Sequence, residues 1–233
     1  RSPYPHARIR SIDASRARAC LGVVAVLTAQ DIPGANCIGP IIKDQPVLCS
    51  DVVRFTGDAV VLVAAETEQA AEEALDHVSV DYDKLPPLMD PLKAMKPDAP
   101  PVHPKGNIGS QFKVHRGDVE KAFREAAVLV ERRFFTQRID HAYMEPEAAL
   151  AVLDAEGGIT VWSSTQTIYF QKEVVAQALG LPQSKVRVIQ PFVGGGFGGK
   201  LAEDPNAPIS AFLAWKTGKT VRLMNNRLED FAA

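Results

Sequence analysis

A cluster of five glycines, one phenylalanine and one lysine occupies residues 194–200, in the last third of the chain. Because glycine has no β-carbon, such a run lets the backbone approach a ligand closely, and successive N–H groups in a turn can bind an anionic group. The apolar alternation of Val186 and Val188 just before the cluster predicts a strand that leads into it. We therefore expect a cofactor-binding loop at the end of a strand.

Two phosphate-binding patterns overlay this loop without matching it fully. Read as G-x-x-x-x-G-K, the loop is followed by Leu201, where a P-loop has a Ser or Thr hydroxyl that binds magnesium. Read as G-x-G-x-x-G, it is followed by Pro205 and Pro208, whereas a dinucleotide-binding turn opens a helix at once. A glycine-rich turn between packed elements is the third interpretation, so the loop alone leaves its ligand open.

Two strands are expected to end beside this loop. A helix that follows Thr167 and ends at Gly180 would join a strand ending near Gln166 to the strand ending near Gly194. The two strand ends would then meet at one edge of a sheet, which is where ligands bind in such arrangements. Upstream, residues 149–153 and 159–163 are expected to form a hairpin, residues 127–135 a strand, and Asp118 the cap of a short helix.

The first 91 residues have the pattern of a compact α/β unit. Strands are expected at residues 9–12, 22–27, 59–65 and 78–82, with a helix from Thr67 as N-cap to about residue 77. Strand, helix and strand in the order 59–65, 67–77 and 78–82 imply a parallel crossover. A connector rich in proline, lysine and glycine follows, from residue 86 to about residue 109.

The composition is that of a globular chain without a strong charge. The 233 residues are 46% hydrophobic and 23% charged, and the formal net charge of −2 provides no argument for binding to nucleic acid or an anionic membrane. No apolar run is long enough to span a membrane, and no signal peptide is visible. Three separated cysteines lack the spacing of a zinc or iron–sulfur site and predict a cytoplasmic location. Because the chain starts at Arg1, we expect an upstream segment to be absent.

Several segments, in the same order along the chain, resemble the molybdenum-binding subunit of the xanthine dehydrogenase/aldehyde oxidase (molybdenum hydroxylase) family, in its amino-terminal half only. The segments that carry this resemblance are 1–9, 22–28, 54–60, 141–146, 162–167, 179–182, 185–188 and 194–200. The resemblance implies a mixed α+β and α/β fold: a hammerhead-like α/β domain at 1–95, a connector at 96–112, and the first part of a molybdopterin-binding α+β domain at 113–233.

The resemblance also implies a chemistry and a set of site residues. A molybdopterin-type molybdenum cofactor would oxidise an activated carbon–hydrogen bond of an aldehyde or N-heterocycle with water as the oxygen source. Gln166 would donate its amide to the apical oxo ligand, while Gly195, Gly196, Phe197 and Gly198 would line the molybdenum and its dithiolene, with the Phe197 ring walling the substrate channel. Gln166 and Phe197 are therefore the expected catalytic residues. The competing interpretation of Gln166 is a core glutamine at a strand end.

Two further residues of the resemblance are expected to be structural. Glu145 occupies a position where the family has an acid, and we interpret it as structural rather than catalytic. Lys200 is expected to order the loop and not to contact a phosphate. No metal ligand is expected from the side chains of this chain.

Two departures from the family pattern limit the expected activity. Xanthine-oxidising members have a glutamate directly after the loop lysine, where this chain has Leu201, and Glu203 cannot be assumed to replace it. The chain stops at Ala233, and the family's catalytic glutamate base lies in the later half. We therefore expect an inactive isolated chain, either half of a split subunit or a fragment of a longer one.

The expected partners are the remaining half of the molybdenum subunit, an iron–sulfur subunit with 2Fe-2S clusters, and an FAD subunit. A non-catalytic scaffold that keeps the fold, or a P-loop-like nucleotide binder, is the alternative function.

Overall fold

The computed structural model describes residues 1–39, 42–201 and 205–232, which form two units. The larger unit contains residues 1–86 and 141–233, and the smaller one residues 87–140. Within the part of the chain that the structure describes, no helix is long and apolar enough to cross a membrane. The predicted boundaries at 95 and 112 are not tested by this division and stay predictions.

The first part of the larger unit is built from two small antiparallel sheets. One sheet has the order β3-β1-β5, and the other pairs β2 with β4. The elements are β1 (Ala7–Asp13), α1 (Ser15–Arg18), β2 (Val23–Thr28), the 3-10 turn η1 (Ala29–Asp31), β3 (Val52–Val53), β4 (Val61–Ala65), α2 (Glu68–Leu75) and β5 (Ser79–Lys84). Thr67 caps α2 as predicted, because its Oγ1 accepts a hydrogen bond of 3.1 Å from the backbone N–H of Ala70.

The parallel crossover predicted around α2 is wrong. β4 pairs antiparallel with β2, and β5 pairs antiparallel with β1 in the other sheet. The crossover rule applies only when both strands belong to one sheet, and the order of elements along the chain does not reveal which sheet a strand joins.

The second part of the larger unit is one four-stranded sheet with its helices, in the strand order β8-β7-β6-β9. β6 and β7 form the predicted antiparallel hairpin, whereas β7 and β8 run parallel and are joined by α5. The bounds are β6 (Ala148–Leu153), β7 (Ile159–Ser163), α5 (Ile168–Leu179), the 3-10 turn η2 (Gln183–Lys185), β8 (Val186–Ile189), α6 (Asn206–Thr217), β9 (Val221–Met224) and α7 (Arg227–Ala232).

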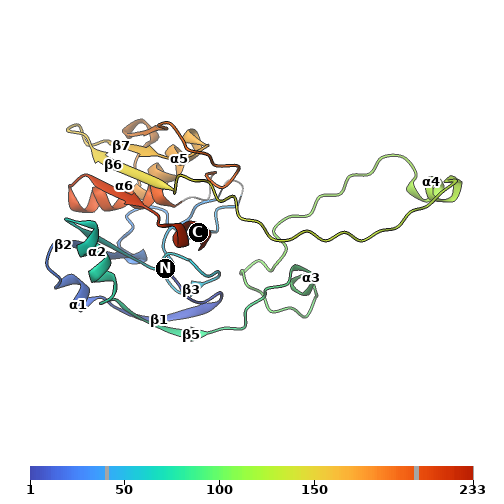
Figure 1. Cartoon of the computed structure of the whole chain (residues 1–233), viewed down its shortest axis with the longest axis horizontal. Coiled ribbons are helices and arrows are strands. Elements are labelled where there is room, and N and C mark those ends of the chain that lie inside the picture. Colours follow the sequence, from blue (N-terminus) through green and yellow to red (C-terminus); the bar gives the residue numbers. More distant parts are fainter. Residues whose placement is uncertain (40–41, 202–204, 233) are drawn as a thin grey trace. The chain divides into compact units, whose positions relative to one another are not determined.

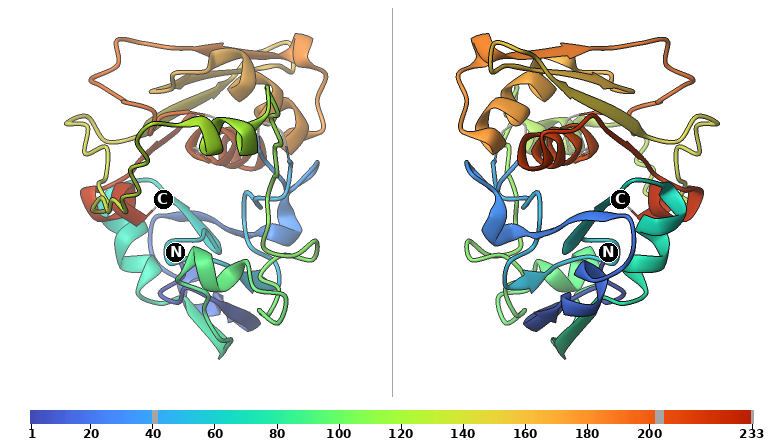
Figure 2. Two further views of the ribbon diagram at one scale, coloured as in Figure 1. Left: turned by 90° about the vertical axis from the view of Figure 1, so that its right-hand side faces the viewer. Right: turned by 90° about the vertical axis from the view of Figure 1, so that its left-hand side faces the viewer.

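Helix α6 lies at the centre of the main core. Every residue from Asn206 to Ala214 is buried, and Figure 1 and Figure 2 show the helix alongside α5 on one face of the four-stranded sheet. Ile38, Val47 and Leu48 from the first part of the unit belong to the same apolar cluster as Phe212 and Leu213. A helix that is apolar on all sides is stable only when covered all round, so both parts of the unit are needed to bury it.

The smaller unit has little regular structure. It contains α3 (Pro91–Ala94) and α4 (Val119–Glu125), and Asp118 caps α4 as predicted through a 2.9 Å bond from Lys121 N–H. The strand predicted at 127–135 is wrong: the structure has these residues in an exposed segment without regular hydrogen bonding. A strand needs a neighbouring strand to satisfy its backbone, and the described residues provide none here.

Truncating a side chain of α6 tests the central position of this helix. Leu213→Ala is expected to lower the free energy of unfolding by about 2–5 kcal/mol, because Leu213 is 3% exposed and its loss leaves a cavity. Leu21, which is 97% exposed, supplies the matched control, and Leu21→Ala is expected to change that free energy by less than about 0.5 kcal/mol. Denaturant unfolding followed by circular dichroism measures both. Similar losses in the two variants would contradict the assignment of α6 to the core.

Candidate functional site

The parallel pairing of β7 and β8 places Gln166 and the glycine loop at the same edge of the sheet. Trp162 lies opposite Ile189 in the register, and Gln166 and Gly194 each follow shortly after the end of their strand. The juxtaposition predicted from the strand, helix and strand pattern is therefore present.

Gln166 is hydrogen-bonded to the end of the loop through both its backbone and its side chain. Its backbone N–H donates to the carbonyl of Lys200 at 2.7 Å. Its side-chain Oε1 accepts from the backbone N–H groups of Gly198 at 3.1 Å and Lys200 at 3.3 Å. Because only the oxygen of a glutamine amide can accept these bonds, the amide orientation is determined. The exposed side chain keeps its Nε2 donor without an acceptor among the residues that the structure describes.

Glycine is required where the loop passes closest to its neighbours. A β-carbon on Gly196 would lie 2.5 Å from Gln166 Oε1, and one on Gly199 would lie 2.8 Å from the ring of Tyr143. Both separations are shorter than any ordinary contact, so substitution would displace the loop or the side chain it meets.

Phe197 adopts a backbone conformation that residues other than glycine rarely take. Its φ is +52°, between Gly195 at +91° and Gly198 at +98°, and the residue is 76% exposed. A non-glycine residue at positive φ costs free energy, and such residues gather at functional sites. An exposed aromatic ring on a strained turn at a sheet edge is the arrangement expected of a ligand wall.

The turn also presents backbone donors. In the described ranges, the N–H groups of Gly195, Gly196 and Phe197 have no hydrogen-bond acceptor. Consecutive unpaired N–H groups in a turn of this kind can bind oxygen atoms of an anionic ligand. Together with the Gln166 amide nitrogen, they fit a ligand rich in oxygen acceptors.

An ion pair beneath the loop ties its two ends together. The Lys200 side chain is fully buried, with Nζ 2.8 Å from Glu145 Oε2 and 4.5 Å from the centre of the Tyr143 ring. Glu145 Oε2 also accepts from Gly194 N–H at 2.6 Å. One carboxylate thus holds the first glycine of the loop and the lysine that ends it. Both charged side chains consequently hold the loop.

The charge on Glu145 is stabilised by these contacts. Burial alone would raise the pKa of Glu145, but the hydrogen bonds from Lys200 and from Gly194 N–H lower it below the ordinary value of 4.5. The carboxylate is therefore ionised at neutral pH and compensates the buried ammonium.

Three buried residues of this site were not anticipated from the sequence. Thr165 Oγ1 donates to Lys200 O at 3.5 Å, Gln171 Nε2 donates to Leu201 O at 3.4 Å, and the Tyr143 ring faces Lys200 Nζ. The available signal was a polar residue type at 165, between β7 and α5, and at 171, inside α5, since buried polar side chains have hydrogen-bond partners. Nothing in the sequence connects Tyr143 with Lys200.

The P-loop and dinucleotide-binding interpretations fail on local structure. Turns occupy residues 197–200, and the next helix, α6, begins only at Asn206. Both phosphate-binding patterns require the helix to start in or directly after the glycines. Glu203 lies outside the described residues. Among the side chains that the structure describes, no group of three or more His, Cys, Asp or Glu residues could hold a metal ion.

The fold and the site define a mixed α and β domain in which a glycine-rich turn and a glutamine side chain meet at one sheet edge. Residues 102–233 match the family model of the molybdopterin cofactor-binding domain, and residues 1–86 match the a/b hammerhead domain of aldehyde oxidase and xanthine dehydrogenase. The chain belongs to the molybdenum hydroxylase family. The predicted family, fold class and molybdopterin-type cofactor are confirmed by these matches.

Relatives of known name share most of this chain. It is 43% identical over 229 residues to the nicotinate dehydrogenase large molybdopterin subunit of Eubacterium barkeri, covering 98% of this chain and 54% of that protein. It is 41% identical over 230 residues to a probable xanthine dehydrogenase subunit of Bacillus subtilis, covering 98% of this chain and 31% of that protein. The chain thus spans about half the length of the first relative and about a third of the second.

A solved structure gives the same result for the fold. Quinoline 2-oxidoreductase from Pseudomonas putida 86 superposes with a TM-score of 0.90 at 30% identity, over 99% of this chain and 31% of that one.

Removing the carboxylate beneath the loop tests its structural role. Glu145→Gln is expected to lower the free energy of unfolding by roughly 1–3 kcal/mol at neutral pH, because Lys200 loses its counter-charge; partial exposure of Glu145 keeps the loss below that of a fully buried pair. Because the pKa of Glu145 is lowered, the wild type has a larger free energy of unfolding than the variant above the ordinary pKa of 4.5. This difference is lost as the pH falls through the lowered pKa. Denaturant unfolding of both proteins between about pH 7 and about pH 3 measures it. A difference that stays constant over this range would contradict the assignment.

Proposed function

We propose that this chain supplies one part of the cofactor pocket of a molybdenum hydroxylase that oxidises an aldehyde or an N-heterocycle with water as the oxygen source. The observation that carries the proposal is the closeness of the Gln166 side chain to a turn in which the N–H groups of Gly195, Gly196 and Phe197 have no acceptor among the described residues. When bound, the molybdenum cofactor supplies the redox chemistry, and the protein supplies binding, orientation and electrostatics.

The residues of this chain have separate tasks in the proposal. Gln166 would help to hold the cofactor by donating a neutral hydrogen bond from its amide nitrogen, since its own oxygen already accepts from the loop. Gly195, Gly196 and Gly198 bring the backbone to the cofactor, and the exposed Phe197 ring forms a wall on the substrate side. Lys200 and Glu145 keep these groups in place and contact neither substrate nor cofactor.

The substrate class is argued from the residue after the loop. Leu201 offers an apolar side chain, where purine-oxidising members of the family have a carboxylate, so xanthine is disfavoured. The relatives include a nicotinate dehydrogenase, a quinoline 2-oxidoreductase and an aldehyde oxidoreductase from Desulfovibrio gigas, and also several xanthine dehydrogenases, so their names alone select no substrate. An N-heterocycle or an aldehyde is therefore the substrate class that we propose.

The proposed assembly contains further polypeptide. No residue of this chain matches the family's glutamate base, so the remaining part of the molybdenum domain would provide it. An iron–sulfur subunit and an FAD subunit would carry the electrons away. A cytoplasmic location stays a prediction, based on three cysteines that are free in the structure.

The cofactor itself is the first test. The purified assembly, with every co-purifying chain retained, is expected to contain molybdenum and pterin in equal amounts, measured by inductively coupled plasma mass spectrometry and by fluorescence of the oxidised pterin. Absence of both would favour the alternative, a scaffold that keeps the fold without binding the cofactor.

A second test concerns the amide donor. Gln166→Glu in the assembly keeps an oxygen that can accept from the N–H groups of Gly198 and Lys200 but removes the amide donor, so it is expected to lower kcat about 10–100-fold, since partners of metal ligands typically contribute that much, while cofactor content changes less than about twofold. Turnover is measured with nicotinate, quinoline and benzaldehyde, and molybdenum content is measured on the same samples. Because Gln166 is exposed, the competing interpretation of a core glutamine is already excluded, and unchanged kcat would show that Gln166 only holds the loop.

A third test concerns the close approach of the loop. Gly196→Ala is expected to reduce retained molybdenum and pterin at least about tenfold, because the added methyl group would overlap Gln166 Oε1 and displace the turn. Gly109→Ala is the matched control, since its β-carbon would meet nothing within 4 Å. Equal cofactor content in the two variants would show that the loop does not approach the cofactor.

A further inference from the structure

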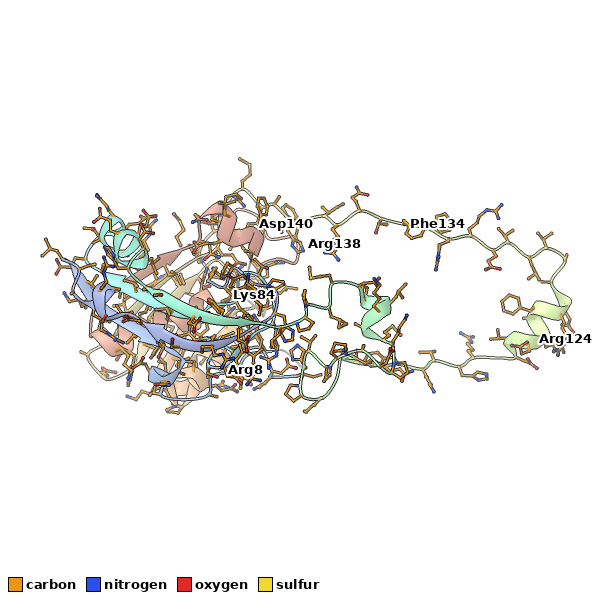
Figure 3. The ribbon with its side chains drawn as sticks, turned by 90° about the horizontal axis from the view of Figure 1, so that it is seen from below. Arg8, Lys84, Arg124, Phe134, Arg138 and Asp140 are labelled. Atoms are coloured by element: carbon orange, nitrogen blue, oxygen red, sulfur yellow. The ribbon has the colours of Figure 1, made fainter. Side chains whose placement is uncertain are left out.

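The largest unexplained feature of the molecule is an exposed apolar segment in the smaller unit, residues 127–139, which we call the apolar arm. Figure 3 shows it as a long extended segment that carries Phe134 and Arg138. Its large apolar side chains are mostly exposed: Val128 77%, Leu129 64%, Val130 74%, Phe134 86%, Phe135 84% and Ile139 79%. Contiguous exposed apolar residues of this size mark a surface that another polypeptide covers.

The backbone of the apolar arm is also without partners. Among the described residues, no backbone group from 127 to 139 makes a hydrogen bond with another backbone group. The contacts of its side chains are local or within the same unit: Arg132 with the carbonyl of Glu131, Arg133 with the Phe135 ring, and Arg138 with the carbonyl of Met89. An extended segment with free N–H and C=O groups is a template for strand addition.

The sequence of the apolar arm fits a strand that is covered on both faces. Val128, Val130 and Phe134 share one face of an extended chain, and Leu129 and Phe135 share the other. Strands with one solvated face alternate apolar and polar residues, whereas strands buried on both faces contain continuous apolar runs. The runs at 128–130 and 134–135 are of the second kind, and the charged residues Glu131, Arg132 and Arg133 separate them, so two short stretches of the arm fit a strand covered on both faces.

The same apolar surface continues at the start of the arm. An open hollow of about 480 Å³ lies beside α4 and is lined by Val119, Ala122, Phe123, Ala126 and Leu129 among others. Leu129 belongs to both features, so the surface extends from the extended segment onto the helix.

The family match identifies the occupant of this surface. The apolar arm lies inside the region matched by the molybdopterin cofactor-binding domain, and the named relatives contain this region within chains of which ours is 54% or 31%. We infer that residues 127–139 form a β-strand only when they pair with a strand from the polypeptide that completes the molybdenum domain. The inference rests on the proposed function, because it assumes that the complete domain is assembled.

Hydrogen exchange in the assembled enzyme tests the inference directly. In the purified assembly, the backbone amides of 128–135 are expected to exchange at least about 100-fold more slowly than those of the connector at 104–112, because ladder hydrogen bonds protect amides. Exchange as fast as in the connector would overturn the inference. Molybdenum and pterin are measured on the same preparation: cofactor present with an unprotected arm would refute the inference while the proposed function stands.

A photo-crosslinker identifies the neighbour. Benzoylphenylalanine in place of Phe134 is expected to form an adduct with a peptide of the completing polypeptide, identified by mass spectrometry after irradiation of the assembly. An adduct with a second copy of residues 1–233, or with the iron–sulfur or FAD subunit, would overturn the inference.

A pair of lysine substitutions provides the matched control. Val130→Lys is expected to raise the exchange rate of the arm amides in the assembly at least about tenfold, because it introduces a charge into a covered face. Leu21→Lys places the same charge on another exposed apolar residue, outside the arm, and is expected to leave this rate unchanged. Equal effects of the two variants, or no effect of either, would contradict the inference.

Discussion

The arrangement of the site depends on a buried positive charge. Lys200 has no exposed surface, and an ammonium group in such a position is stable only with a counter-charge and hydrogen bonds. Glu145 provides the counter-charge and at the same time accepts from Gly194 N–H. The charge pair therefore sets where the glycine loop begins and ends, and the backbone of Lys200 then sets the position of Gln166.

The layers beneath the loop explain why this geometry can be maintained. The parallel pairing of β7 with β8 brings two strand ends together, and α6 fills the space under the sheet with a helix that is buried along most of its length. Thr165 and Gln171, both without exposed surface, donate to the carbonyls at the end of the loop. A turn with a strained Phe197 needs such support, since strain persists only where the surroundings hold it.

The sequence allowed prediction of the features that depend on local signals. The cap at Thr67, the hairpin of β6 and β7, and the common edge of Gln166 and Gly194 all follow from patterns within a few residues or from one crossover. The partners of β4 and β5 could not be predicted, because sheet membership depends on residues distant in the chain. The contact between Tyr143 and Lys200 was missed for the same reason. The roles of Gln166, Gly195, Gly196, Phe197 and Gly198 toward the cofactor remain proposals, although the structure brings these residues together.

The strand predicted at 127–135 is wrong because a strand-like sequence pattern forms a strand only when a neighbouring strand pairs with it. The hairpin of β6 and β7 and the apolar arm have similar apolar strand patterns, but only the hairpin finds its neighbour among the described residues. The site and the arm consequently differ in where their partners lie. The contacts of Glu145, Lys200 and Gln166 are all made within the larger unit, so this part of the proposed pocket needs no residue of another polypeptide to hold its shape. The apolar arm, in contrast, would become ordered only when it pairs with the completing polypeptide, and the entropy cost of ordering it would then fall on assembly. The sequence of the arm would therefore affect assembly and not cofactor binding.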